Sequence, residues 1–351
     1  MTMQLSPRDL DLIRDVATFK YLDSHQLKRR FFPTSTHQNA TRRLRDLAST
    51  ETTDPFLSRL WYYPRPTLSP MGGHPIAVFI FTSKNKQHLR QYLEGAHRAD
   101  IYARDFAHLL TTDPISPVAT PDIWHELAIS DFFLALTGAT DTTNTLGFWE
   151  RTSPFSKDIK TTLTITRTNR RTKKSETAYR HFNPDAVFLL SDHKHNPHFY
   201  IVEYDNNTHS TERIKQKYES FIGFSTQKRF PDLIRHYKNK YLLDIPDPKT
   251  TPVYFLTVAA NPNNDHKRRN DLLLHSLPYN WNQQLLFASI TDCTRDTILT
   301  PIWLRGNEYH KHAEKHLDKI ATQPPHPALQ LQLISTILND SNRMPRVQLL
   351  H

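Results

Sequence analysis

Two short apolar runs constrain the fold of this chain more than any other feature. Residues 186–190 (Ala-Val-Phe-Leu-Leu) and 199–205 (Phe-Tyr-Ile-Val-Glu-Tyr-Asp) have the length and composition of strands, and a polar, turn-rich stretch separates them. Two adjacent strands of this kind place Asp185 and Glu203 near each other at one end of a sheet. Because side chains alternate along a strand, Glu203 and Asp205 share a face.

These three carboxylates predict a divalent-metal site. They would repel one another unless a cation lay between them, and oxygen ligands suit Mg²⁺ or Mn²⁺. The pattern is typical of a metal-dependent nuclease. Pro-Asp at a strand start and Glu-x-Asp at a strand end also occur in ordinary surface loops. From this fragment alone, the alternative that these residues have no catalytic role stays open.

The composition favours a polyanionic partner. The chain has 351 residues, which is enough for two or three domains, and it carries a net charge of +10 with a pI near 9.5. A protein this basic most often binds nucleic acid, although basic proteins without such a ligand exist. The single cysteine, Cys293, excludes a disulfide framework and a cysteine-based zinc site.

Other sequence features exclude further classes of protein. No apolar run is long enough for a spanning helix, and the first residues lack an apolar signal core, so we expect a soluble, cytoplasmic protein without a membrane partner. Glycine is scarce, and no glycine-rich phosphate loop is present. This argues against a nucleotide-driven motor.

The first 95 residues have the element order of a winged helix-turn-helix. Capping and apolar spacing predict helices and strands in the order helix from Ser6-Pro7, helix 24–31, helix 37–48, strand 57–63, strand 76–82 and helix 84–93. The third helix would enter the major groove, and the loop 64–75 would form the wing. Its side chains suited to base edges and phosphates are Gln38, Asn39, Arg42, Arg43 and Arg45. The alternatives are a domain for protein contact or a solvated basic face.

The remaining residues predict a mixed α/β domain. A connector at 96–120 precedes helix–strand–strand–strand–helix–strand order between 121 and 260, and the domain continues to 306. Alternating apolar residues also predict a strand at 159–168. Residues 307–351 are expected to form a helical tail. The basic turn formed by Arg170, Arg171, Lys173 and Lys174 is either a solvated loop or a place where a DNA backbone would lie.

Several of these motifs together resemble the replication-relaxation family, whose members are encoded on bacterial plasmids and integrative elements. The likeness rests on the predicted winged helix, Pro184-Asp185, Glu203-x-Asp205-x-x-Thr208 and Lys217-x-x-x-Phe221, and continues to 253–257 and 301–303. It implies an α+β or mixed α/β protein in which a winged helix-turn-helix precedes a PD-(D/E)xK restriction-endonuclease-like domain. It also implies a DNA-binding role in replication, mobilisation or regulation of a mobile element, with a homodimer and other proteins of the element as candidate partners.

The resemblance assigns roles to individual residues. Asp185 matches the Asp of the motif and Glu203 matches its second acid, while Asp205 stands where an active nuclease has Lys. That Lys orients the attacking water and offsets charge on the phosphate, which an Asp cannot do. Lys217, which fits the family pattern, or Lys215 as a reserve, could replace it.

Two functions follow from this departure. Either Asp185, Glu203 and Lys217 form the active site of a Mg²⁺- or Mn²⁺-dependent DNA endonuclease, with Asp205 as a further metal ligand and Asp131 or Glu150 as an extra acid. Or the chain is a DNA-binding protein on an inactive nuclease fold.

Overall fold

The chain folds into two compact units. A computed structural model describes residues 4–49, 55–62, 75–107, 120–140, 144–151, 162–168, 175–181, 184–206, 210–260, 265–276, 284–300, 302–306 and 346–350. The units comprise Met1–Asp131 and Phe132–His351, and the boundary between them lies within helix α6 (Thr120–Ala139). The fold is mixed α/β, as the sequence predicts.

The first unit is built on capped helices. Ser6 and Asp9 form a capping box at the start of α1, and Asp23 and Gln26 do the same at the start of α2. Thr36 accepts a hydrogen bond from the Asn39 N–H at the start of α3. These caps satisfy backbone N–H groups that would otherwise lack partners. The helices are α1 (Pro7–Phe19), α2 (Ser24–Phe31), α3 (His37–Leu47), α4 (Ser83–Gly95) and α5 (Ala99–Asp105).

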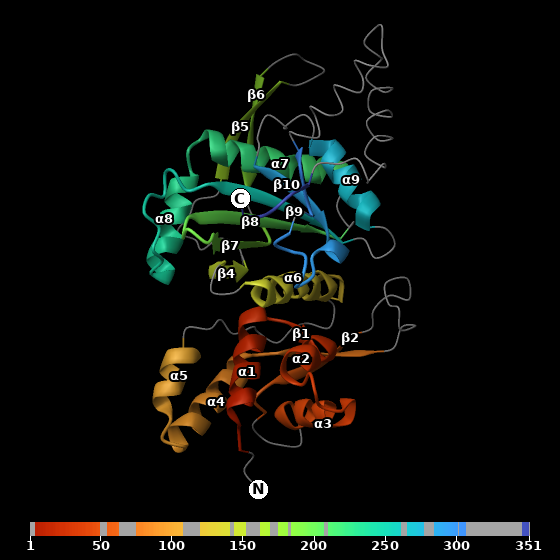
Figure 1. The fold of residues 1–351 in the computed structure, drawn as a ribbon, viewed down its shortest axis with the longest axis vertical. Helices are drawn as coiled ribbons and strands as arrows, with labels where there is room; N and C mark the ends of the chain where they lie inside the picture. The colour runs from red at the N-terminus through yellow and green to blue at the C-terminus, as the bar shows by residue number, and fades with distance from the viewer. Residues whose placement is uncertain are drawn as a thin grey trace. The chain divides into compact units, whose positions relative to one another are not determined.

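A small antiparallel sheet completes the first unit. Strands β1 (Leu22–Asp23), β2 (Ser58–Tyr62) and β3 (Ile76–Ile80) lie in the order β1-β3-β2. Figure 1 labels β1 and β2 in this unit. The two strands predicted after the third helix are therefore confirmed. Residues 64–74 of the predicted wing at 64–75 lie outside the described residues.

The limits of the first unit differ from the predicted ones. Helix α5 lies inside the stretch expected to be a connector, and the unit continues to Asp131. Residues 108–119 of that stretch fall outside the described part of the chain.

The second unit contains a seven-stranded mixed sheet. Its strand order is β12-β11-β10-β9-β8-β7-β4, and β8, β9 and β10 run parallel while all other neighbours are antiparallel. The strands are β4 (Thr145–Arg151), β7 (Ala186–Ser191), β8 (Pro197–Asp205), β9 (Val253–Ala259), β10 (Leu285–Ser289), β11 (Trp303–Arg305) and β12 (Arg346–Val347). The adjacent strands predicted at 186–190 and 199–205 are confirmed as β7 and β8, which pair with Ala186 opposite Val202.

A separate hairpin joins β5 (Thr162–Thr168) to β6 (Ser175–His181). Its first strand lies within the predicted strand 159–168, but its second strand was missed because few of its residues are apolar. The predicted basic turn, with Arg170, Arg171, Lys173 and Lys174, lies outside the described residues. So do residues 307–345, which hold most of the predicted helical tail.

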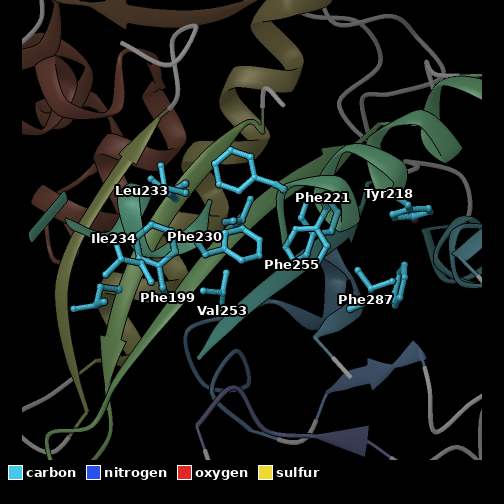
Figure 2. Close-up of a cluster of buried hydrophobic side chains, with 14 of the residues drawn as sticks. Phe199, Tyr218, Phe221, Phe230, Leu233, Ile234, Val253, Phe255 and Phe287 are labelled. Atoms are coloured by element: carbon cyan, nitrogen blue, oxygen red, sulfur yellow. The ribbon is translucent and has the colours of Figure 1, made fainter. Parts of the chain in front are cut away.

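Helices cover both faces of the large sheet. On one face, α7 (Thr211–Thr226), α8 (Phe230–Tyr241) and α9 (Asp265–Ser276) bury a continuous apolar core against the strands. Figure 2 shows part of this core, in which Phe221, Leu233 and Ile234 of the helices meet Phe199 and Phe255 of the sheet. Fully burying each such side chain contributes about 1.5–3 kcal/mol, so this core is a large part of the unit's stability.

The opposite face carries a layer of aromatic side chains. Because side chains alternate, Phe188 and Tyr200 point away from α7 and stack on each other with ring centroids 4.7 Å apart. Phe132 and Phe133, from the part of α6 in this unit, pack against Phe188. The Tyr200 hydroxyl donates a hydrogen bond to the Leu349 carbonyl, so Leu349 contacts this layer, while Arg346 and Val347 form the edge strand β12.

Candidate functional site

Asp185 is fixed at the point where β7 begins. Its backbone N–H donates to the Val202 carbonyl at 2.9 Å, and its Oδ2 accepts from the Tyr204 N–H at 2.7 Å. The carboxylate is therefore held against the backbone of β8, next to Glu203. This is the juxtaposition that the two predicted strands indicate.

Glu203 forms an ion pair with Lys217. Glu203 lies near the end of β8 opposite Thr257 of β9, and it is only 4% exposed. Its Oε1 contacts the Nζ of Lys217, which projects from α7. Burial lowers the pKa of Lys217, while the negative charge of Asp185 acts in the opposite direction. Asp185, Glu203 and Lys217 thus influence one another at one end of the sheet.

The helical position of Lys217 explains why it reaches Glu203. Lys217 lies three residues after Ile214 and four before Phe221, both of which are buried in the core, so it shares the sheet-facing side of α7. Lys215 is rotated by about 200° from Lys217 around the helix axis. It lies near His275, whose pKa is lowered by burial and then by the Lys215 charge.

Asp205 is engaged by an arginine that the sequence analysis did not single out. Both of its carboxylate oxygens accept from Arg268 of α9, with the Nε–Oδ1 and Nη2–Oδ2 distances both 3.0 Å. Asp205 is 2% exposed and Arg268 9% exposed. A bidentate pair of this kind is among the stronger hydrogen-bonded contacts in proteins. Asp205 thus faces a cation supplied by the protein itself.

The predicted three-carboxylate metal site is not gathered into one ligand group. Within the described ranges, no set of three or more His, Cys, Asp or Glu side chains is placed to hold a metal ion. Mg²⁺ keeps several water ligands and is often bound through only one or two carboxylates. Asp185 and Glu203 would suffice for that coordination, with Lys217 beside them.

Two further acids considered from the sequence have other partners. Glu150 Oε2 accepts from Lys240 Nζ and from the Tyr241 hydroxyl, both at 2.5 Å. Asp131 pairs with Arg29 in the first unit, with Nη2–Oδ1 at 2.9 Å. Neither contact involves Asp185 or Glu203.

Helix α3 presents most of the predicted DNA-contacting side chains to solvent. Ala40, Leu44 and Leu47 form its buried stripe, so the polar residues lie on the remaining surface. The exposed ones are Gln38, Asn39, Arg42 and Arg45.

Arg43 differs from its neighbours because it joins α3 to the start of α1. Its Nε donates to Asp9 Oδ1 at 3.0 Å, and its Nη2 donates to Asp9 Oδ2 at 2.5 Å and to the Gln4 carbonyl at 2.9 Å. Burial acts to raise the pKa of Asp9, but hydrogen bonds from Arg43 and Ser6 outweigh it and lower that pKa. Arg43 therefore stabilises the first unit, a contribution that helical spacing alone does not reveal.

Replacing Arg43 by alanine is expected to destabilise the first unit by about 3 kcal/mol at neutral pH, because it leaves the buried Asp9 carboxylate without its charged partner. Since the pKa of Asp9 is lowered in the folded protein, this stabilisation is present above the ordinary carboxyl pKa and is lost as the pH falls through the lowered value. Urea unfolding at pH 7 and pH 3 measures both effects. Arg42→Ala, on the exposed side of the same helix, is the control, and equal losses in both variants would contradict the assignment.

A second surface feature was also missed by sequence analysis. On β2, Arg59 and Trp61 are exposed on the same side of the strand, and the Arg59 guanidinium lies 5.1 Å from the Trp61 ring centroid. Trp61 is 54% exposed, which is unusual for a side chain of its size. The Arg-x-Trp spacing within a predicted strand was the signal that could have identified this pair.

Comparison with known proteins assigns the chain to a family. The model of the replication-relaxation family matches residues 13–233. The chain belongs to the replication-relaxation family. The match confirms the family inferred from the sequence, and it points to a role in the replication or relaxation of a mobile element. No curated protein and no solved structure matches the chain at a significant level.

The family match covers the candidate site only in part. It includes α3, Asp185, Glu203 and Lys217, whereas Arg268 lies beyond its last matched residue. Across the described ranges, no helix combines the length and apolar character needed to cross a membrane.

Proposed function

We propose that this replication-relaxation protein binds DNA through its first unit and cleaves a phosphodiester bond with its second. The observation that carries the proposal is the placement of Lys217 against Glu203 beside Asp185. The two acids and one lysine of a PD-(D/E)xK site would be supplied by the start of β7, by β8 and by α7. The lysine would thus come from helix α7, whereas the motif has its lysine at the position of Asp205 on β8.

The topology of the first unit supports DNA binding. The order α1-β1-α2-α3-β2-β3, with the short β1 paired to β3, agrees with the order expected of a winged helix-turn-helix and so supports this proposal. In that arrangement α3 is the recognition helix. Its exposed Arg42 and Arg45 would contact phosphates and bases, and Gln38 and Asn39 would contact base edges. The Arg59–Trp61 pair on β2 offers a further cation and an aromatic ring to the nucleic acid.

The topology of the second unit supports a PD-(D/E)xK-like core. Helix α6 is followed by β4, β7 and β8 as antiparallel neighbours, then by helices, and then by β9, which is parallel to β8. With the β5–β6 hairpin between β4 and β7 left aside, this is the helix–strand–strand–strand–helix–strand order predicted from the sequence. Asp185 directly precedes β7, and its carboxylate lies against β8 next to Glu203.

Each residue of the proposed site would have a separate role in hydrolysis. Asp185 and Glu203 would hold Mg²⁺ or Mn²⁺, which supplies Lewis acidity and a water of lowered pKa. The Tyr204 N–H keeps the Asp185 carboxylate in place. Lys217 has three donor hydrogens, so it can keep its contact with Glu203 while it orients the attacking water or offsets charge on the phosphate.

A plasmid-cleavage assay tests this function. Purified protein is incubated with supercoiled plasmid carrying the origin region of its own element, in Mg²⁺, Mn²⁺ or EDTA. We expect metal-dependent nicking or linearisation that an Asp185→Ala/Glu203→Ala variant loses while it still binds the plasmid. An Arg42→Ala/Arg45→Ala variant should bind less tightly. The slope of its log binding constant against log salt concentration should be smaller by the amount expected for about two phosphate contacts. Cleavage that survives loss of both acids would refute the proposed active site.

One observation favours a second candidate function. Asp205 occupies the position of the motif lysine and is paired with Arg268 instead. A site altered in this way fits a DNA-binding protein that retains a nuclease fold without cleavage. Tight, salt-sensitive binding that the double acid variant keeps, together with no cleavage in any metal, would establish this alternative.

A further inference from the structure

The Asp205–Arg268 pair lies at the same strand end as the candidate site. Asp205 follows Glu203 by two residues on β8, so the two side chains share a face and are about 7 Å apart along the strand. Arg268 reaches Asp205 from α9, 63 residues later in the chain. The backbone is also fixed here, because the Ala260 N–H donates to the Asp205 carbonyl at 2.8 Å.

Arg268 affects the ability of Asp205 to act as a metal ligand. A free carboxylate beside Asp185 and Glu203 would add a third anionic oxygen ligand, which raises the affinity of such a site for divalent cations. The planar guanidinium instead satisfies both Asp205 oxygens through Nε and Nη2 at 3.0 Å. It also balances the Asp205 charge, as Lys217 balances that of Glu203.

We propose that Arg268 is a positioning residue that keeps Asp205 out of the metal ligand set, so that Asp185 and Glu203 alone hold the ion. This inference rests on the proposed metal site and deepens it. The guanidinium supplies, from within the protein, the positive charge that a second divalent cation would otherwise bring to Asp205. The position that lost the motif lysine is therefore occupied by a neutral ion pair.

A purely structural role for Arg268 has a different consequence. In that case its removal would lower stability by the same amount with or without metal. If Arg268 takes the place of a cation, the loss will be offset when a divalent ion is available, because Asp205 then becomes a ligand. The dependence of stability on metal separates the two roles.

The test compares the melting temperature of the full chain in EDTA and in Mn²⁺ for the natural protein, Arg268→Met and Asp205→Asn/Arg268→Met. We expect Arg268→Met to melt at a lower temperature in EDTA. Its melting temperature should rise with Mn²⁺ by about 5 °C more than that of the natural protein. The double variant has no carboxylate at position 205, so it should lose this excess.

Either of two results would overturn the inference. One is an equal Mn²⁺-induced shift in Arg268→Met and the natural protein, and the other is an excess shift that persists in the double variant. A paramagnetic-resonance titration of Mn²⁺ with the natural protein and with Asp185→Ala/Glu203→Ala tests the underlying site separately. Equal Mn²⁺ binding by those two proteins would refute the proposed function, whereas the melting comparison alone decides the role of Arg268.

Discussion

Lys217→Met is expected to reduce metal-dependent DNA cleavage by at least about 10²-fold while leaving DNA binding unchanged. Methionine keeps the length and apolar stem of the side chain but removes the charge that contacts Glu203. The loss should appear in the maximal rate, because a group that acts on the developing phosphate charge stabilises the transition state more than the bound substrate. Single-turnover cleavage of a plasmid and a gel-shift titration measure the two quantities.

Lys215→Met is the matched control for this variant. It removes the same charge from the same helix two residues away, at a side chain that lies near His275. We expect it to cleave at the natural rate, so equal losses in the two variants would show that general basicity of α7, and not Lys217, supports cleavage. Burial lowers the pKa of Lys217. As the pH rises, the cleavage rate of the natural protein should therefore begin to fall at a lower pH than it would if Lys217 had the pKa of an exposed lysine.

Leu349→Ala is expected to destabilise the second unit by about 2–5 kcal/mol, because it removes buried apolar atoms and leaves a cavity. Leu349 is 1% exposed, and its carbonyl accepts the hydrogen bond of Tyr200. Calorimetric unfolding of the full chain should show a lower transition temperature for the second unit and an unchanged one for the first.

The exposed Leu242 provides the control for that experiment. Leu242 is 90% exposed at the end of α8, so Leu242→Ala removes the same atoms without opening a cavity. Its transition temperature should equal that of the natural protein. If Leu349→Ala behaves in the same way, the last described residues do not contribute to the core.

The sequence was sufficient to predict those parts of the site that depend on local pattern. The strands β7 and β8 are apolar, are separated by a turn and begin or end in acids, so their pairing placed Asp185 near Glu203. Lys217 could be ranked above Lys215 through the family pattern, and the structure places it on the sheet-facing side of α7.

Contacts between distant residues could not be predicted in the same way. Arg268 lies 63 residues from Asp205, and nothing in a run of basic residues at the start of a helix indicates which carboxylate one of them will meet. Arg43 has the spacing of a surface residue, yet it forms an ion pair with Asp9, which lies 34 residues earlier in the chain. Such pairings are set by how helices pack, which single-sequence periodicity does not specify.

The bond between Tyr200 and Leu349 also has a consequence for the order of folding. It joins residues 149 positions apart, so this contact of the aromatic layer cannot form until Leu349 has left the ribosome. In the described part of the first unit, helices α1–α5 and strands β1–β3 lie within residues 7–105 and can fold much earlier during synthesis. If the proposed function holds, the unit that binds DNA would therefore be able to fold before the unit that cleaves it is complete.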